Sequence, residues 1–307
     1  MTSAERTRRN LFAHAQIDRC GEHRADKTWL AARRASPAAR WLGFDIDGRA
    51  PVLGGRIAWL DSATIAPGVA ANFLGMHAGE PLFTLCEPLS HDALPEARWM
   101  GLREAAAALP AAEAGLIAYA RSLANWQAAT RYCGFCGASL RLVDGGHRAV
   151  CDGCGRMHFP RTDAAIIVIV EHEDACLLGR QASWPNGRYS TLAGFVEPGE
   201  SLADAVRREV REETGVVVTD CDFHSSQPWP FPASLMLGFT ATAAGRAITL
   251  GDGELEDARW FSAREIANGL RDGSLSVSTP ISISYRLLEH WLRTRARLDL
   301  DALPRAG

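Results

Sequence analysis

Residues 194–216 constrain the fold more than any other stretch, because acidic and basic residues recur there at fixed intervals around one expected helix. Ser201 followed by Asp204 is a helix-capping pattern, and Gly215 is a typical helix stop. The pattern therefore predicts a helix over Ser201–Thr214. Its buried side would consist of apolar residues at helical spacing: Leu202, Ala205, Val206 and Val210.

Carboxylates gather on one flank of this helix. Glu209 and Glu213 are one turn apart and Glu212 lies beside them, so their like charges repel. One interpretation is a surface ion-pair network, because arginines are interleaved with them, namely Arg207, Arg208 and Arg211. The other interpretation is a site for a hard divalent cation. Mg²⁺ or Mn²⁺ takes oxygen ligands from a few carboxylates and from substrate phosphates.

The spacing of the whole stretch favours the cation site. Gly194, five residues, Glu200, seven residues, then Arg208-Glu209 and Glu212-Glu213 resembles the complete signature of the Nudix hydrolase superfamily. The resemblance implies an enzyme that hydrolyses a nucleoside diphosphate linked to another group, with Mg²⁺ or Mn²⁺ held by the helix carboxylates. Such a reaction needs metal because negative charge shields a pyrophosphate, and metal ions neutralise that charge.

The resemblance also implies a role for each residue of the motif. Glu209 and Glu213 would be direct metal ligands, and Glu212 would be a ligand or the group that orients water. Glu200 would orient the metal site, and Arg208 would hold a catalytic glutamate by a charge-assisted hydrogen bond. Two further metal ligands lie outside the helix: the backbone carbonyl of Ala193 and, in an acidic loop that could equally be solvated, Glu254.

A proline-rich segment, Ser226–Ser234, follows this motif. Prolines restrict the backbone, so Trp229 and Phe231 would be held in a stiff, extended loop that suits stacking on a flat ring. The alternative is a proline-rich linker that caps the core. The segment resembles the Ser-Gln-Pro-Trp-Pro-Phe-Pro-x-Ser array of the NADH pyrophosphatases within the Nudix superfamily.

This second resemblance implies that the array lines a nucleotide pocket, with Gln227 and Ser234 as polar contacts and Trp229 and Phe231 as walls. The other array residues assigned to the pocket are Pro228, Pro230, Pro232 and Ala233. Two more residues complete the expected pocket: Phe159, where relatives carry a tyrosine that stacks on the adenine, and Ser284, a small residue near the last helix.

Four cysteines form two Cys-x-x-Cys pairs, Cys133 with Cys136 and Cys151 with Cys154, separated by fourteen residues. This spacing is typical of a tetrahedral zinc site with a short hairpin between the pairs. Two disulfides are the alternative, but nothing in the sequence indicates an oxidising compartment. We expect one structural zinc ion per chain, because four thiolates leave no coordination position open. A zinc ribbon immediately before the catalytic domain also resembles the NADH pyrophosphatase arrangement.

The chain divides into four expected segments: 1–28, possibly disordered; 29–128, a strand-rich domain ending in one or two helices; 129–160, the zinc ribbon; and 161–300, the catalytic domain. In the catalytic domain we expect a final helix over 281–295 and strands over 164–170, 175–180, 189–193, 216–218, 235–242 and 247–250. By resemblance, the fold class is α+β, with a Nudix α/β/α sandwich and mixed sheet at the C-terminus and a Nudix-like domain at the N-terminus.

Composition agrees with a soluble, multi-domain enzyme. At 307 residues, 47% hydrophobic and 22% charged, the chain is too long for one small core and too apolar for disorder. A net charge of -3 disfavours a protein that coats nucleic acid, and no run is apolar enough to span a membrane. A cytoplasmic location is expected because the N-terminus lacks a hydrophobic signal core. The family resemblance adds an expected homodimer.

The sequence thus predicts hydrolysis of NADH, and less efficiently of NAD⁺, to AMP and nicotinamide mononucleotide. The resemblance also implies removal of 5′ NAD caps from RNA, because a cap is the same dinucleotide extended at the AMP ribose. A broader diphosphatase acting on ADP-ribose or diadenosine compounds is the alternative enzyme. A nucleotide sensor with an inactive Nudix fold is the alternative from another class, and the intact carboxylates and Arg208 disfavour it.

Overall fold

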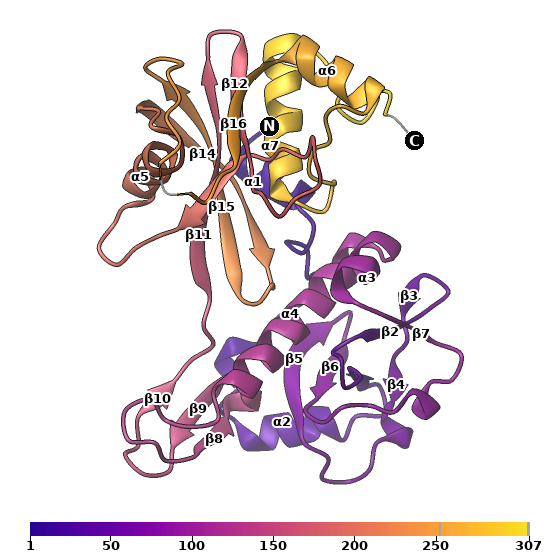
Figure 1. Cartoon of the computed structure of the whole chain (residues 1–307). Coiled ribbons are helices and arrows are strands. Elements are labelled where there is room, and N and C mark those ends of the chain that lie inside the picture. The colour runs from indigo at the N-terminus through magenta and orange to yellow at the C-terminus, as the bar shows by residue number, and fades with distance from the viewer. Residues whose placement is uncertain (252, 306–307) are drawn as a thin grey trace. The chain divides into compact units, whose positions relative to one another are not determined.

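The computed structural model describes residues 1–251 and 253–305. The chain folds into two compact units, whose helices and strands are drawn in Figure 1. The first unit contains residues 1–13 and 163–228 and the chain from residue 234 onward, and the second contains residues 14–162 and 229–233. No helix in the described ranges is long and apolar enough to cross a membrane.

A six-stranded mixed sheet forms the middle of the first unit. Its strands run in the order β14-β15-β11-β12-β16, and β13 pairs with β11 off this path. β11 is parallel to β15 and antiparallel to β12 and β13. The strands are β11 Asp163–His172, β12 Ala175–Arg180, β13 Leu192–Phe195, β14 Val218–Trp229, β15 Ser234–Ala243 and β16 Asp257–Ser262. The helices are α1 Ser3–Arg9, α5 Leu202–Thr214, α6 Ala263–Asp272 and α7 Ile283–Trp291, which continues as a π-helix over Leu292–Ala296.

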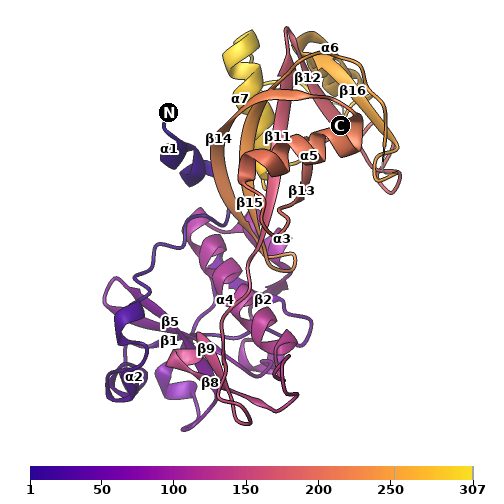
Figure 2. The ribbon, with the colours of Figure 1, turned by 90° about the vertical axis from the view of Figure 1, so that its left-hand side faces the viewer.

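The central strand β11 is buried on both faces, which explains its unbroken apolar sequence. Side chains alternate across a strand, so Ile166 and Val168 pack in the core that contains α5, while Ile167 and Ile169 pack in the core that contains α7. Figures 1 and 2 show α5 and α7 on opposite faces of the sheet. This arrangement confirms the expected α/β/α sandwich with a mixed sheet.

The second unit is strand-rich, as expected, and its sheets run in the orders β4-β1-β6-β5, β3-β2-β7 and β10-β9-β8. Trp41, Phe73 and Phe83 are buried together in its core. The strands are β1 Arg40–Leu42, β2 Ala50–Leu53, β3 Arg56–Ile57, β4 Leu60–Asp61, β5 Ala71–His77, β6 Glu80–Leu85, β7 Arg98–Met100, β8 Leu140–Val143, β9 Arg148–Cys151 and β10 Met157–His158. The helices are α2 Lys27–Arg34, α3 Leu102–Ala108 and α4 Ala111–Ala129. α3 and α4 fulfil the expectation of one or two helices before the ribbon.

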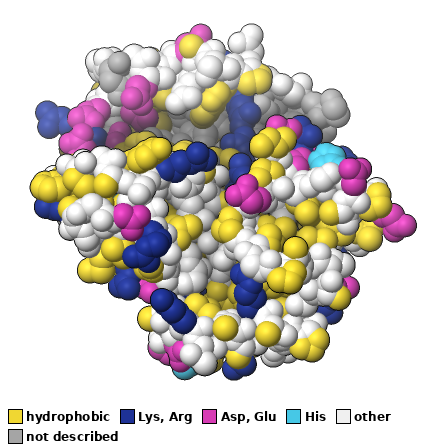
Figure 3. All heavy atoms as spheres, turned by 90° about the horizontal axis from the view of Figure 1, so that it is seen from below, with side chains coloured by type: hydrophobic (Ala, Val, Ile, Leu, Met, Phe, Trp, Pro, Cys, Tyr) yellow, Lys and Arg dark blue, Asp and Glu magenta, His cyan; other side chains and the backbone are white. Residues whose placement is uncertain are grey.

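The surface view in Figure 3 mixes basic, acidic and hydrophobic side chains over the face that it shows. The face carries no large field of one sign. This mixture agrees with the small net charge of -3.

The start of the chain is ordered where the sequence suggested possible disorder. Helix α1 lies there, with a capping box formed by Thr2 and Glu5. The Nε of Arg6 donates a hydrogen bond to the carbonyl oxygen of His224 on β14 at 2.9 Å. Charge-rich sequence without apolar periodicity predicts disorder, but here polar contacts to a distant strand hold the segment.

Two strand predictions near β14 also need correction. The expected strand over 247–250 is absent, because the N–H of Thr249 donates to the carbonyl oxygen of Thr214 at the end of α5, at 2.8 Å, instead of to a neighbouring strand. Of the expected short strand over 216–218, only Val218 is in a strand, as the first residue of the much longer β14. β16 and α6, which follow the mispredicted strand, were not expected.

Candidate active site

Helix α5 forms as its sequence predicts. The Ser201 hydroxyl accepts a hydrogen bond from the N–H of Asp204 at 3.2 Å, and Gly215 ends the helix with a φ of 69°. Ala205, Val206 and Val210 are fully buried against the sheet, whereas Leu202 is 37% exposed and lies outside the buried side. The buried side of α5 therefore fixes the direction in which the helix carboxylates point.

Arg208 joins three carboxylates. Its Nε and Nη2 donate to the two carboxylate oxygens of Glu200 at 2.6 and 2.9 Å. Its Nη1 donates to Glu209 and to Glu212, each at 2.9 Å, and its Nη2 also donates to the carbonyl oxygen of Phe195 at 2.8 Å. Charge-assisted, bidentate hydrogen bonds fix direction as well as distance. Arg208 thus links the carboxylates of α5 to the loop that precedes the helix.

Strand β13 approaches α5 very closely at Gly194. A Cβ atom at this position would lie 1.9 Å from the Cδ atom of Glu209, so any other side chain would collide with the carboxylate. The preceding residue, Ala193, is exposed and pairs with Ile167 on β11. The structure therefore brings the backbone at Gly194 next to the Glu209 carboxylate, which the sequence motif alone did not show.

The surroundings of the carboxylates shift their acidity in opposite directions. Hydrogen bonds from Arg208 lower the pKa of Glu200 to about 2, so Glu200 stays ionised at neutral pH. Burial raises the pKa of Glu209 above its usual value; Arg208 opposes this shift, and the negative charges of Glu212 and Glu254 add to it. A carboxylate whose anionic form is disfavoured by burial and by like charges gains most from a nearby cation.

The remaining acidic residues differ in exposure. Glu213 is 4% exposed at the end of α5. Glu254 is exposed on the loop before β16, yet its charge raises the pKa of Glu209, so the two carboxylates are close enough to interact. Taken together, the donors are oxygens only, which is the set that Mg²⁺ and Mn²⁺ prefer. The Glu209 carboxylate occupies the space that a side chain at position 194 would fill, and its negative charge suits such an ion.

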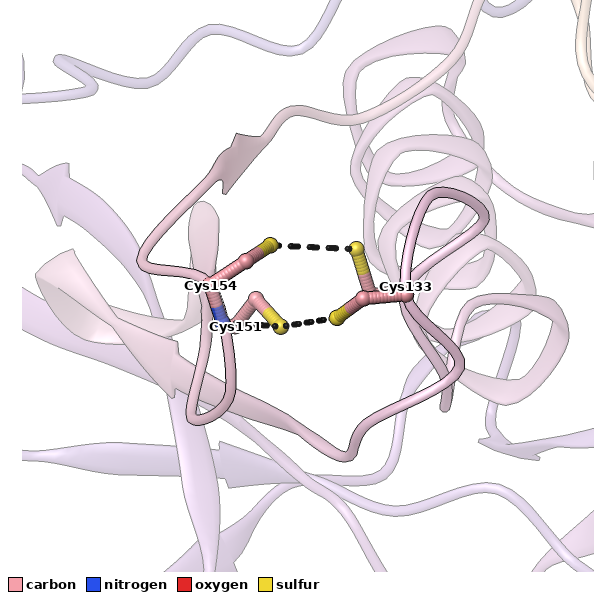
Figure 4. A group of neighbouring side chains, drawn as sticks. Cys133, Cys151 and Cys154 are labelled. Carbon is pink, nitrogen blue, oxygen red and sulfur yellow. Dashed lines mark hydrogen bonds between the residues drawn. The ribbon is translucent and has the colours of Figure 1, made fainter.

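The four cysteines meet at one point (Figure 4). All their sulfur atoms lie within 4.8 Å of one another. The Sγ atoms of Cys133 and Cys154 are 3.8 Å apart, and those of Cys136 and Cys151 are 3.4 Å apart. A tetrahedral zinc with Zn–S bonds of about 2.3 Å needs sulfur atoms about 3.8 Å apart. In the described ranges, this is the one group of three or more metal-ligating side chains with all ligand atoms so close.

Each cysteine pair lies in the same kind of turn. Gly137 and Gly155 have φ of 75° and 71°, and their N–H groups donate to the carbonyl oxygens of Cys133 and Cys151 at 2.8 and 3.0 Å. Backbone N–H groups lower the pKa of Cys133 to about 7 and that of Cys151 to about 6, which favours the metal-binding thiolate. The antiparallel β8–β9 hairpin between the pairs confirms the expected hairpin.

The proline-rich array forms the tip of a hairpin instead of a separate loop. β14 ends at Trp229 and β15 begins at Ser234. The rings of Trp229 and Phe231 meet edge to face with centroids 5.0 Å apart, and the guanidinium of Arg103 lies 4.6 Å from the Phe231 ring centroid. Arg103 was not expected at this place, because no local pattern links it to an aromatic pair so distant along the chain.

Gln227 is fully buried and its amide is bonded to backbone groups. Its Nε2 donates to the carbonyl oxygens of Leu11 and Ile281 at 3.0 and 2.7 Å, and its Oε1 accepts from the N–H of Ile283 at 2.7 Å. These bonds use both N–H groups of the amide. The structure therefore gives Gln227 a role in holding the strand, and its expected contact with substrate stays a prediction.

Two other expected pocket residues differ in exposure. Phe159 is 61% exposed, whereas Ser284 is 4% exposed. The hydroxyl of Ser284 lies 2.8 Å from the Ser190 hydroxyl and accepts a hydrogen bond from the Thr191 hydroxyl at 2.9 Å. The substrate contacts expected for Phe159, Ser284, Ser234, Ala233 and the prolines of the array stay predictions.

Comparison with known proteins finds two related domains in the chain. Residues 160–277 match the NUDIX domain, and residues 28–126 match the NADH pyrophosphatase-like rudimentary NUDIX domain. Between them lie the cysteines of the ribbon. The two matches therefore cover both sides of the cysteine cluster.

Several curated proteins are similar to most of this chain. NAD-capped RNA hydrolase NudC of Stutzerimonas stutzeri is 42% identical over 246 residues, covering 80% of this chain and 86% of that protein. The NudC protein of Chromobacterium violaceum is 38% identical over 219 residues, covering 71% of this chain and 79% of that protein. NAD-capped RNA hydrolase NUDT12 of Homo sapiens is 39% identical over 199 residues, covering 61% of this chain. The chain spans only 43% of the length of that human relative.

Proposed function

Because this chain belongs to the Nudix hydrolases that carry an NADH pyrophosphatase-like domain, we propose that it hydrolyses the pyrophosphate bond of NADH and NAD⁺. Water adds to one phosphorus, the anhydride P–O bond breaks, and the products are AMP and nicotinamide mononucleotide. The observation that carries the proposal is the cluster in which Arg208 joins Glu200, Glu209 and Glu212 beside Gly194. A non-catalytic sensor has no need of this cluster.

We assign a role to each group of the site. Glu209, Glu212, Glu213 and the Ala193 carbonyl would hold Mg²⁺ or Mn²⁺, with Glu254 as a further carboxylate. When bound, the metal neutralises the diphosphate oxygens and makes phosphorus more open to attack by water. Arg208 orients the carboxylates that it contacts, and the ionised Glu200 anchors Arg208. Such supporting hydrogen bonds set the direction of ligand oxygens.

Removal of a 5′ NAD cap from RNA is the second activity that we propose. It is supported by the names of the relatives, NAD-capped RNA hydrolases, and by the chemistry of the cap, which presents the same pyrophosphate. The alternative is a broader diphosphatase. These activities are distinguished by the relative kcat/KM for NADH, NAD⁺, NAD-capped RNA, ADP-ribose and a diadenosine compound. Preference for ADP-ribose would overturn the proposed specificity. An unchanged cap would overturn the second activity.

We further propose that Cys133, Cys136, Cys151 and Cys154 bind one structural zinc ion, which their mutual distances support. Four thiolates that bind metal must stay reduced, and this supports a cytoplasmic location.

A homodimer is the expected assembly of this family. Size-exclusion chromatography with light scattering tests the dimer.

Arg208→Lys is expected to lower kcat for NADH by about 10–100-fold, the usual effect of losing a group that orients metal ligands. Lysine keeps the charge but lacks the planar fork that contacts Glu200, Glu209 and Glu212 at once. Steady-state kinetics with saturating Mg²⁺ measures the effect. Arg207→Lys is the matched control, because Arg207 has only a 3.6 Å ion pair with Asp204. Full activity of Arg208→Lys would contradict the positioning role.

Gly194→Ala is expected to lower kcat by a similar factor, about 10–100-fold, while the melting temperature stays close to the original. The new Cβ would displace the Glu209 carboxylate, a flexible group that can swing aside without unfolding the domain. Gly245→Ala is the control, because nothing lies within 4 Å of a Cβ there. An unchanged kcat in Gly194→Ala would show that the observed position of Glu209 does not matter for turnover.

A further inference from the structure

Strand β14 leads into the proline-rich array and buries polar residues, which is unusual. His224, Ser225 and Gln227 are 3%, 0% and 0% exposed, although all are polar. Buried polar groups need hydrogen-bond partners, because an unsatisfied one is costly. β14 is also the terminal strand in its sheet order, so its outer backbone groups lack a neighbouring strand. The buried polar side chains and the outer backbone groups of β14 therefore both require hydrogen-bond partners from another segment.

Several partners of β14 lie in the first residues of the chain, beside the bonds from Gln227 to Ile281 and Ile283. The Nδ2 of Asn10 donates to the Ser225 hydroxyl at 3.1 Å and to the carbonyl oxygen of Ser226 at 2.9 Å. The N–H of Ser226 donates to the Thr7 hydroxyl at 3.2 Å. Both backbone groups of Ser226 on the open edge of the sheet are therefore bonded to side chains of the N-terminal segment. Asn10 itself is only 1% exposed.

The same contacts continue along the strand in both directions. Arg6 bonds the carbonyl oxygen of His224 at 2.9 Å, and Leu11 accepts from the amide of Gln227 at 3.0 Å. Each residue from 224 to 227 is thus bonded to the segment over residues 6–11. The array continues immediately at Pro228. Because these contacts include Ser226 and Gln227, the N-terminal segment holds the first two residues of the array itself.

We propose that residues 1–13 are a positioning segment for the substrate array, with Asn10 and Thr7 as its positioning residues. This inference rests on the proposed function, in which the array binds the nucleotide. The segment belongs to the same compact unit as β14 and satisfies its edge with side chains instead of a strand. Substrate binding depends on residues that are held in the geometry of the bound state. Loss of the segment therefore weakens nucleotide binding more than it slows the chemical step at α5.

Deletion of residues 1–13 is expected to raise KM for NADH about tenfold, a loss of about 1.4 kcal/mol in binding, and to leave kcat within about twofold. A synthetic peptide of residues 1–13, added in excess, should restore KM, which a general loss of stability would not allow. Isothermal titration calorimetry measures the Kd of AMP for the original chain and for the shortened chain. This measurement does not require turnover.

Point variants of the full chain keep the inference testable if the shortened chain fails to fold. Asn10→Ala and Thr7→Val should each raise KM, and Thr7→Ser, which keeps the hydroxyl, should not. Arg8→Ala is a control at an exposed position of α1. Unchanged KM and AMP affinity in Asn10→Ala and Thr7→Val would overturn the inference. A full-length chain that does not hydrolyse NADH would instead overturn the proposed function, while its AMP affinity would still decide the role of the segment.

Discussion

Glu213→Gln is expected to abolish turnover of NADH and leave the fold intact. Glu213 is 4% exposed on α5, and glutamine has the same shape but lacks the negative charge that a divalent cation requires. Loss of a pre-organised electrostatic partner typically lowers kcat by about 10²–10³-fold, and we expect at least this effect. Steady-state kinetics with Mg²⁺ and with Mn²⁺ measures kcat, and a thermal melt checks the fold.

The control for this variant is Glu197→Gln. Glu197 is exposed on the loop before α5, and its backbone bonds Glu200: its N–H donates to the Glu200 carboxylate at 3.0 Å, and its carbonyl oxygen accepts from the Glu200 N–H at 3.1 Å. Its variant should keep the original kcat. Full activity in Glu213→Gln would remove the metal role assigned to this carboxylate. A large fall in melting temperature would instead show that Glu213 mainly supports the fold.

Removal of zinc is expected to have the largest effect on stability. Structural zinc contributes on the order of 10 kcal/mol to the folding of a small module, and the ribbon's own sheet has only short strands, β8, β9 and β10. Cys151→Ser, at a residue only 2% exposed, should lower the zinc content below one ion per chain and make residues 129–160 sensitive to protease. Metal analysis by mass spectrometry and limited proteolysis measure both.

Cys86→Ser is the matched control for the zinc prediction. Cys86 is exposed and lies outside the cysteine cluster, so its variant should retain one zinc ion and the original protease resistance. Chelation should reproduce the effect of Cys151→Ser in the original chain. A full complement of zinc in Cys151→Ser, or a metal-free chain that resists protease, would contradict a structural zinc site at these thiolates.

Local patterns predicted the parts of the molecule that depend on local forces. The cap at Ser201, the stop at Gly215 and the apolar spacing between them predicted α5 with its correct ends. The unbroken apolar run over 164–170 predicted the strand that is observed as β11. The spacing of the cysteines predicted that their sulfur atoms would meet, since two knuckles and a hairpin are close in sequence.

Local sequence patterns could not predict contacts between segments that are distant along the chain. β14 buries polar residues whose partners lie in distant segments, residues 6–11 and 281–283, so no alternation of apolar and polar residues marked it. For the same reason α1 looked like a possibly disordered start. The motif identified Arg208 and Glu209, but the clearance at Gly194 depends on how β13 packs against α5, which only the fold shows.

The Arg208–Glu209 cluster is expected to support hydrolysis of the NADH pyrophosphate bond. The most direct test is chromatographic product analysis of NADH incubated with Mg²⁺ and either the original chain or Glu213→Gln. We expect equal amounts of AMP and reduced nicotinamide mononucleotide from the original chain and essentially none from the variant. Intact NADH with the original chain, or the same products in equal yield from the variant, would contradict it.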